Sequence, residues 1–346
     1  MLDDLKLIHE RDAQDALGIA EKEWQQLEYE FDLKTPDFTK NDIQNIVFAG
    51  MGGSALGALL SQTWPSYDVP FEVCRGYDIP KYVSDKTLFI ASSYSGNTEE
   101  TLEALAKVEK ANAKILVIAS SGKLAEIAKE KNYPIAILPS VTQPRYAALY
   151  SFKAVVSWLI KLGFIDKNDS DKEIKSAVEL LKQEIPSWIP TASSNKNQAK
   201  QIALDLIGKS VVVYAGPKMF PAAYKWKISL NENAKNVAWC NQYPEFSHNE
   251  FIGWTSHPLD KPYAVVDLRS NLEHSQIQKR FEVTERMLSG RRPAPIVIEA
   301  KGESILQQML WAVALGDFVS LYTAILNGLN PTPVDIIEKM KQELAK

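Results

Sequence analysis

The sequence is poor in the features that mark secreted, metal-binding and nucleic-acid-binding proteins. It has only two cysteines, Cys74 and Cys240, and their separation matches neither a disulfide framework nor a metal motif. Its 39 lysines and arginines nearly balance its 43 aspartates and glutamates. Without a long basic block, a nucleic acid or an anionic membrane is a poor partner. The charged, helical start is unlike a secretory signal, so we expect a protein of the reducing cytoplasm.

Long uncharged apolar runs are scarce as well. Residues 309–326 come closest to a membrane span, but they include Asp317, and carboxylates are rare inside membranes. Residues 146–164 are similar and include Lys153 and Lys161. We therefore expect both runs to be buried helices, the first of them inside the fold or at a subunit interface.

What the chain does have is a regular alternation of short apolar strands and helices. Its 346 residues exceed the usual size of one domain, so we expect two domains. In the first half, residues 45–64 and 87–112 each predict a strand, a loop and a helix. Further strands are expected at 71–75, 114–120 and 133–140. This order indicates a parallel sheet with helices on both faces.

The second half repeats this order of elements, although the two halves share little identity. Residues 210–235 and 262–288 each predict a strand, a loop and a helix, and residues 294–300 predict another strand before the long apolar helix. The stretch between the halves is more polar and contains two prolines. The predicted organisation is a helical lead-in (1–40), an N-terminal domain (41–165), a linker region (166–200) and a C-terminal domain (201–346).

The glycine loop "GMGGSALG" at residues 50–57 has three interpretations. Glycines let the backbone approach a ligand closely, and the following helix N-terminus would point amide groups at an anion. More narrowly, Gly50, Gly52 and Ala55 match a dinucleotide fingerprint after a strand, and Arg75 would receive a 2′-phosphate. In the third interpretation the glycines only permit tight packing of the strand and helix.

A cluster of short polar side chains follows the next predicted strand, in "SSYSGNT" at residues 92–98. In a parallel sheet, ligands bind beyond the carboxyl ends of the strands. We therefore expect Ser54, Ser93, Ser95 and Thr98 to form a site of neutral donors suited to a phosphate monoester. The alternative is that Asn97 or Thr98 caps the helix that follows, with Glu100 in its first turn.

The two loops resemble a known family. "GMGGS" followed by "SYSGNT" resembles the sugar-isomerase (SIS) domain, a flavodoxin-like α/β sandwich that binds phosphosugars. "QPRYAA" (143–148), "NENAK" (231–235), "PEFSHNEF" (244–251) and "NPTPVDIIEKMK" (330–341) resemble the bifunctional phosphoglucose/phosphomannose isomerases. The resemblance extends from about residue 45 to the C-terminus. It implies two SIS domains, each a three-layer α/β/α sandwich, in a homodimer with shared active sites that needs neither metal nor cofactor.

The resemblance also implies roles for particular residues. Glu232 would move a proton between C2 and C1 of the sugar, and His248, reaching the site from the partner subunit, would assist ring opening. Arg145 would stabilise the enediolate. Lys341 matches a lysine near the end of the chain, with Lys339 as a nearby rival. The phosphate would be held by residues of the two loops: Gly52, Gly53, Ser54, Ser93, Ser95 and Thr98.

The chemistry of an aldose–ketose isomerase suits these residue types. Ring opening needs an acid and a base that titrate near neutral pH, which histidine supplies. Removing a proton from carbon needs a carboxylate made more basic by burial, and the enediolate needs fixed cations or donors. Each residue also has an ordinary structural interpretation. Glu232 would pair with Lys235 on a surface helix, His248 would be an exposed loop residue, and Lys341 would coat a helix.

Two other functions stay open at this point. One is a non-catalytic SIS module that binds phosphosugars without Glu232 or His248, and the other is an NADP-dependent oxidoreductase built on the glycine loop. Val334 stands where some members of the family carry a threonine, with Thr332 two residues earlier. The resemblance links that position to the mannose epimer, so acceptance of mannose 6-phosphate is less secure than isomerase activity.

Overall fold

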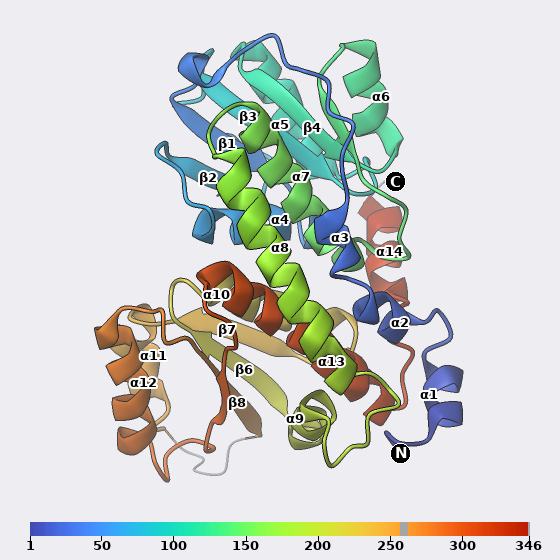
Figure 1. Cartoon of the computed structure of the whole chain (residues 1–346), viewed down its shortest axis with the longest axis vertical. Helices are drawn as coiled ribbons and strands as arrows, with labels where there is room; N and C mark the ends of the chain where they lie inside the picture. The colour runs from blue at the N-terminus through green and yellow to red at the C-terminus, as the bar shows by residue number, and fades with distance from the viewer. Residues whose placement is uncertain (257–261, 345–346) are drawn as a thin grey trace. The chain divides into compact units, whose positions relative to one another are not determined.

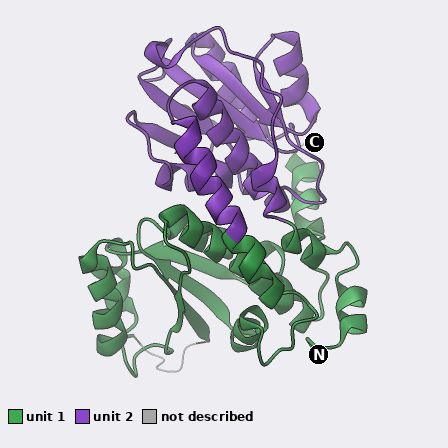
Figure 2. Ribbon diagram, viewed as in Figure 1, with its two compact units in different colours: residues 1–22, 180–346 green, residues 23–179 purple. Residues whose placement is uncertain are grey.

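The computed structural model describes residues 1–256 and 262–344, and the chain divides into two compact units (Figures 1 and 2). Unit 1 comprises residues 1–22 and 180–346, and unit 2 comprises residues 23–179. The boundary after residue 179 falls inside α8 (Lys167–Glu184), within the region predicted to cross between the domains.

The first residues of the predicted lead-in fold with unit 1. They form α1 (Leu5–Arg11) and α2 (Ala16–Glu21). The carboxylate of Asp3 accepts a hydrogen bond from the buried Lys200 ammonium at 3.0 Å. A buried ammonium needs such acceptors, and the carbonyls of Pro190 and Ala192 supply two more. The start of the chain therefore completes a polar site in unit 1.

Unit 2 contains one five-stranded sheet, which is parallel throughout, in the order β2-β1-β3-β4-β5. This is the flavodoxin-like order, so the predicted fold class is confirmed for this half. The strands are short and mostly buried, as parallel strands covered on both faces must be: β1 (Asn45–Ala49), β2 (Phe71–Cys74), β3 (Thr87–Ser93), β4 (Lys114–Ala119) and β5 (Ile135–Ile137).

Helices cover both faces of this sheet (Figure 1). Phe48 and Ile90 pack on one face against α4 and α7, while Val47 and Phe89 pack on the other against α5 and α6. Alternate residues of each strand thus enter different cores. The helices of unit 2 are α3 (Gln25–Glu28), η1 (Lys40–Asp42), α4 (Gly53–Thr63), α5 (Glu99–Lys110), α6 (Gly122–Glu130), η2 (Pro144–Ala147) and α7 (Ala148–Lys161).

Unit 1 contains a four-stranded parallel sheet in the order β7-β6-β8-β9. This reproduces the first four positions of the other sheet, so the predicted internal repeat is confirmed as a repeat of topology. The strands are β6 (Ser210–Ala215), β7 (Ala238–Gln242), β8 (Tyr263–Arg269) and β9 (Ile296–Glu299). β7 was missed from the sequence, because "AWCNQ" has neither an apolar run nor a regular alternation.

The helices of unit 1 continue the chain from α8. α12 packs on one face of the sheet, where Ile277 and Phe281 join Val212 and Val265, and α10 packs against β6 and α13. The helices after α8 are η3 (Ile185–Ser187), α9 (Gln198–Leu206), α10 (Phe220–Glu232), η4 (Glu245–His248), α11 (Glu250–Gly253), α12 (Ser275–Met287), α13 (Ile305–Leu326) and α14 (Asp335–Leu344).

The long apolar helix α13 is a core helix, as predicted. It is long and apolar enough to cross a membrane, but 94% of its most apolar window is buried inside the fold. Its carboxylate, Asp317, accepts hydrogen bonds from Lys225 at 2.5 Å and from Ser229 at 2.7 Å, both on α10. Asp317 and Lys225 thus neutralise each other where α10 packs on α13.

Removing one member of this buried pair should destabilise the fold strongly. Asp317→Ala leaves the Lys225 ammonium buried without its counter-ion, and we expect a loss of about 3–5 kcal/mol of unfolding free energy. Asp171→Ala is the matched control, because Asp171 pairs with Lys167 on an exposed helix face, and such pairs contribute about 0.3–0.5 kcal/mol. Urea denaturation measures both. Equal losses in the two variants would contradict the prediction.

Candidate functional site

The glycine loop after β1 serves two structural purposes at neighbouring positions. Gly52 is exposed and has a φ of +50°, which favours glycine, and it precedes the first residue of α4. At Gly53 an added Cβ would lie 3.0 Å from the backbone nitrogen of Arg145. The packing interpretation therefore accounts for Gly53, while the N-terminus of α4, which has no side-chain cap at Gly52, matches the anion interpretation.

The four residues predicted to hold a phosphate, here called the hydroxyl cluster, are Ser54, Ser93, Ser95 and Thr98. Of these, Ser95 is exposed, and its hydroxyl accepts a hydrogen bond from the backbone N–H of Asn97 at 3.3 Å. The hydroxyls of Ser93 and Thr98 are 2.8 Å apart. The hydroxyl of Ser54 accepts a hydrogen bond from the backbone N–H of Tyr94 at 3.0 Å. β1 and β3 are neighbouring parallel strands, so the loops that follow them meet at the same edge of the sheet.

Helix capping does not account for the hydroxyl cluster. Thr98 is the N-cap residue of α5, but its side chain makes no capping hydrogen bond. Asn97 instead accepts a hydrogen bond from the backbone N–H of Lys123, at the start of α6, at 3.0 Å. The capping alternative is therefore confirmed for the position of Thr98, but the side-chain hydrogen bond that would cap α5 is not made. The first turn of α5 carries Glu99 and Glu100, as the capping interpretation required, but without the side-chain cap.

Arg145 lies in η2, between β5 and α7, and is 1% exposed. Its guanidinium lies over the ring of Tyr146, 4.6 Å from the ring centre, and donates to the Tyr146 hydroxyl at 3.4 Å. The close contact between Gly53 and the backbone of Arg145 brings η2 against the glycine loop. Unit 2 thus brings together the glycine loop, the hydroxyl cluster and the Arg145 backbone.

Glu232 lies in unit 1 as the last residue of α10 and is half-buried. The neighbouring amides are both held: Asn231 donates to the carbonyl of Lys227 at 2.7 Å, and Asn233 donates to Ser320 at 2.9 Å. Asparagine is a poor helix former, and the helix does end here. The Lys235 ammonium donates to the carbonyl of Asn330 at 2.8 Å and thereby ties the residues after α10 to the segment that precedes α14.

The other predicted residues of unit 1 lie on separate elements. His248 is the last residue of η4 and is exposed. Lys341 lies on α14, where it is exposed and pairs with Glu338 at 2.8 Å. Thr332 is buried and Val334 is half-buried, both just before α14. Glu232, His248 and Lys341 therefore come from α10, η4 and α14 of one unit.

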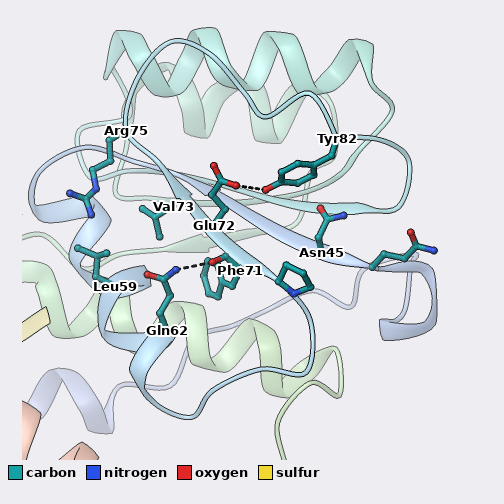
Figure 3. A pocket seen from close by; sticks show the side chains of 10 residues that line it. Asn45, Leu59, Gln62, Phe71, Glu72, Val73, Arg75 and Tyr82 are labelled. Atoms are coloured by element: carbon teal, nitrogen blue, oxygen red, sulfur yellow. Dashed lines mark hydrogen bonds between the residues drawn. The ribbon is translucent and has the colours of Figure 1, made fainter. Parts of the chain in front are cut away.

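Arg75, which the dinucleotide interpretation needs, lines a cavity of about 700 Å³ along the edge strand β2 (Figure 3). There the Tyr82 hydroxyl donates to Glu72 at 2.6 Å, and Gln62 donates to the carbonyl of Phe71 at 2.8 Å. The residues that line the cavity do not include residues 50–53 of the glycine loop.

In unit 1 the corresponding loops are filled by the chain's own carboxylate. Gly216 and Glu273 follow β6 and β8, the counterparts of β1 and β3. The Glu273 carboxylate accepts from the backbone N–H groups of Lys218 at 2.7 Å and Met219 at 3.2 Å, just before α10. A Cβ at Gly216 would lie 2.3 Å from this carboxylate. Where unit 2 has hydroxyls at the helix N-terminus, unit 1 has a buried acid.

Sequence reasoning missed this difference between the two halves. The signal was present, because "SNLEH" (270–274) follows β8 as "SYSGNT" follows β3, with one acid in place of several hydroxyls. The comparison of loops by element order would have found it.

Two family models match the chain. One, described as the SIS domain, matches residues 41–160, and the other, described as the bacterial phospho-glucose isomerase C-terminal SIS domain, matches residues 195–344. Two similar curated proteins are each named bifunctional phosphoglucose/phosphomannose isomerase. The protein from Caldicellulosiruptor bescii is 36% identical and that from Aquifex aeolicus 35%, and each alignment covers 88% of this chain and 91% of the relative.

The fold is shared with solved structures at low sequence identity. One of them is a glucose-6-phosphate isomerase like protein from Thermus thermophilus, with a TM-score of 0.65 and 16% identity over 99% of this chain and 98% of that one. At this identity the likeness concerns the fold alone.

The carboxyl of Glu273 should make stability depend on pH. Burial raises its pKa above the ordinary value of 4.5, although the hydrogen bonds from Lys218 and Met219 lower it in part. The folded state therefore binds the proton more tightly than the unfolded state. The stability from this proton is lost as the pH rises from the unfolded-state pKa through the raised folded-state pKa. Glu273→Gln removes the titration. Relative to this variant, the natural chain should be more stable near pH 5 than near pH 7.5 in urea denaturation.

Glu282→Gln is the control for this measurement, because Glu282 is an exposed residue of α12. Its stability relative to the natural chain should be the same at both pH values. The prediction would be contradicted if the difference in unfolding free energy between Glu273→Gln and the natural chain were also the same at both pH values.

Proposed function

The chain belongs to the family of bifunctional phosphoglucose/phosphomannose isomerases, and we propose that it interconverts glucose 6-phosphate with fructose 6-phosphate through a cis-enediolate. The observation that carries the proposal is the hydroxyl cluster, in which the Ser93 and Thr98 hydroxyls lie 2.8 Å apart at the carboxyl end of β3. Helix capping does not account for these hydroxyls, and they lie beside the N-termini of two helices, where a phosphate monoester is bound favourably.

The phosphate is the group that this site holds, and its binding energy orients the reacting end of the sugar. Gly52 and Gly53 bring the backbone N–H groups of α4 close to it, and Ser54, Ser93, Ser95 and Thr98 donate hydrogen bonds. Neutral donors suit a dianion that must also leave after each turnover, because they bind it less tightly than lysines or arginines would.

The proton transfer falls to Glu232 in this proposal. Its carboxylate takes the proton from C2 of the open-chain aldose and returns it to C1, while the proton of the C2 hydroxyl passes to the C1 oxygen. The aldehyde thereby becomes an alcohol and C2 becomes the ketone. The negative charge that builds up on the enediolate oxygens is stabilised by Arg145, with Lys341 as a second cation. The half-buried end of α10, where both flanking asparagines are tied, supports a carboxylate held in one place.

Ring opening precedes this step and requires proton transfer between the ring oxygen and the C1 hydroxyl. We assign it to His248, because histidine is the side chain type that can both donate and accept a proton near neutral pH. The exposed position of His248 supports its delivery to the site of a partner subunit. The proposal therefore includes a homodimer with shared active sites, located in the cytoplasm and independent of metal and cofactor.

Mannose 6-phosphate is proposed as a second substrate. It differs from glucose 6-phosphate only at C2, the carbon that loses the proton, so both reach the same enediolate. Val334 stands where some relatives have a threonine, and Thr332 is buried two residues earlier. The names of the relatives from Caldicellulosiruptor bescii and Aquifex aeolicus, which are bifunctional isomerases, support turnover of both epimers.

Replacing the proposed base tests the mechanism directly. Glu232→Gln keeps the shape of the side chain and removes its basicity, so we expect turnover of glucose 6-phosphate to fall about 10²–10⁴-fold. Formation of fructose 6-phosphate measures it, with EDTA present and no nucleotide added. Glu282→Gln, the exposed control, should retain full turnover. Full turnover by Glu232→Gln would overturn the assignment, and binding without turnover by the natural chain would favour a non-catalytic phosphosugar module.

The hydroxyl cluster should govern affinity more than turnover. Ser93→Ala and Thr98→Val each remove one hydrogen bond to a charged phosphate, which contributes about 1.5–3 kcal/mol. We expect each to raise KM about tenfold to hundredfold, with a smaller change in kcat. Thr35→Val, at an exposed threonine of unit 2, is the control. An unchanged KM in both cluster variants would place the phosphate elsewhere.

A further inference from the structure

We propose that Glu250 is a positioning residue for isomerisation, because its carboxylate anchors the segment that carries His248. The inference rests on the proposed role of His248 in ring opening. His248 is the last residue of η4, two residues before the start of α11, and its own side chain is exposed. The placement of its imidazole therefore depends on how the backbone is held on either side.

The first anchor lies two residues before His248 and is apolar. Phe246 is completely buried, with its ring centre 4.5 Å from that of Tyr214 and 5.0 Å from that of Tyr243. Tyr243 in turn packs on Phe281 of α12 at 4.4 Å. This aromatic cluster holds η4 onto the face of the sheet. Ring packing alone resists lateral shifts weakly, because its energy changes gradually with offset.

The second anchor lies two residues after His248 and is polar. One oxygen of the Glu250 carboxylate accepts a hydrogen bond from the Tyr214 hydroxyl, and the other accepts from the side-chain amide of Asn241 at 2.6 Å. Tyr214 and Asn241 are register partners on the adjacent strands β6 and β7. Their side chains thus form a rigid pair of donors that matches the two carboxylate oxygens.

The donors are themselves held in place. Tyr214 is completely buried, and its hydroxyl accepts from the indole N–H of Trp254 at 3.0 Å while it donates to Glu250. The guanidinium of Arg292 lies over the Tyr214 ring, 5.6 Å from its centre. Burial and the neighbouring Glu250 carboxylate raise the pKa of Tyr214, which keeps the hydroxyl protonated as a donor.

Asn249 links the two anchors across His248. Its side-chain carbonyl accepts from the backbone N–H of Glu250 at 2.6 Å, and its amide donates to Glu245 at 2.5 Å. The backbone around His248 is therefore restrained at Phe246, Asn249 and Glu250. A shift of about 1 Å in a catalytic group can cost about a hundredfold in rate, so releasing Glu250 should impair catalysis without touching the phosphate.

A double-mutant cycle tests whether Glu250 acts through His248. Glu250→Ala and His248→Ala should each lower kcat about tenfold to hundredfold, with KM changed less than about threefold. The double variant should be no slower than His248→Ala, within about a factor of two, because the anchor has nothing left to position. Glu282→Ala should retain full activity. Additive losses in the double variant would overturn the inference.

A donor–acceptor exchange keeps the test decisive even where Glu250→Ala fails to fold. Glu250→Gln still accepts from Tyr214, but its amide then faces the Asn241 amide, donor against donor. Adding Asn241→Asp supplies an acceptor and restores the second hydrogen bond with its direction reversed. We expect Glu250→Gln to lose activity and the Glu250→Gln, Asn241→Asp pair to recover most of it. Full activity in Glu250→Gln alone would overturn the inference, and so would a double variant that is no more active than Glu250→Gln.

The outcomes also separate this inference from the proposed function. Full turnover by His248→Ala would remove His248 from the mechanism, and the positioning role of Glu250 with it. Loss of turnover in His248→Ala, combined with additivity in the cycle, would leave the proposed isomerase standing and overturn only the role of Glu250.

Discussion

The carboxyl ends of neighbouring parallel strands meet at one edge of a sheet, and the candidate site of unit 2 depends on that constraint. β1 and β3 are adjacent in the sheet although β2 lies between them in sequence. The start of α4, which carries Ser54, and the end of β3, which carries Ser93, therefore come together, and the Ser54 hydroxyl accepts a hydrogen bond from the backbone N–H of Tyr94. Parallel topology thus creates the cluster before any ligand is considered.

Local sequence patterns were enough to predict most of this framework. Apolar strands followed by glycine or hydroxyl loops gave the positions of β1 and β3, and the repeated order gave the second sheet. β7 was not predicted, because "AWCNQ" is only partly buried and shows no periodic pattern of apolar residues. The apolar run of α13 was assigned to the interior correctly, although its partner Lys225 lies 92 residues away.

Fewer of the site residues than of the strands and helices could be predicted from local sequence patterns. The hydroxyl cluster could be predicted, because it depends on the residue types next to the ends of strands, which is a local property of the sequence. Glu232, His248 and Lys341 entered through family resemblance, because little in the local sequence separates them from surface residues. Arg145 also follows a strand and a proline, at the end of the sheet where ligands bind. The partners of Glu250 were out of reach for another reason. Tyr214 is 36 residues away, and only the pairing of β6 with β7 brings it beside Asn241.

The two units share a topology but differ in the side chains that lie at the helix N-termini after the first and third strands. In unit 1 the backbone N–H groups of Lys218 and Met219, just before α10, already donate to Glu273, so these two groups need no acceptor from solution. In unit 2 a bound phosphosugar would add stability by mass action. The resistance of unit 2 to local opening, and so to proteolysis, would then rise with the concentration of the phosphosugar in the cell.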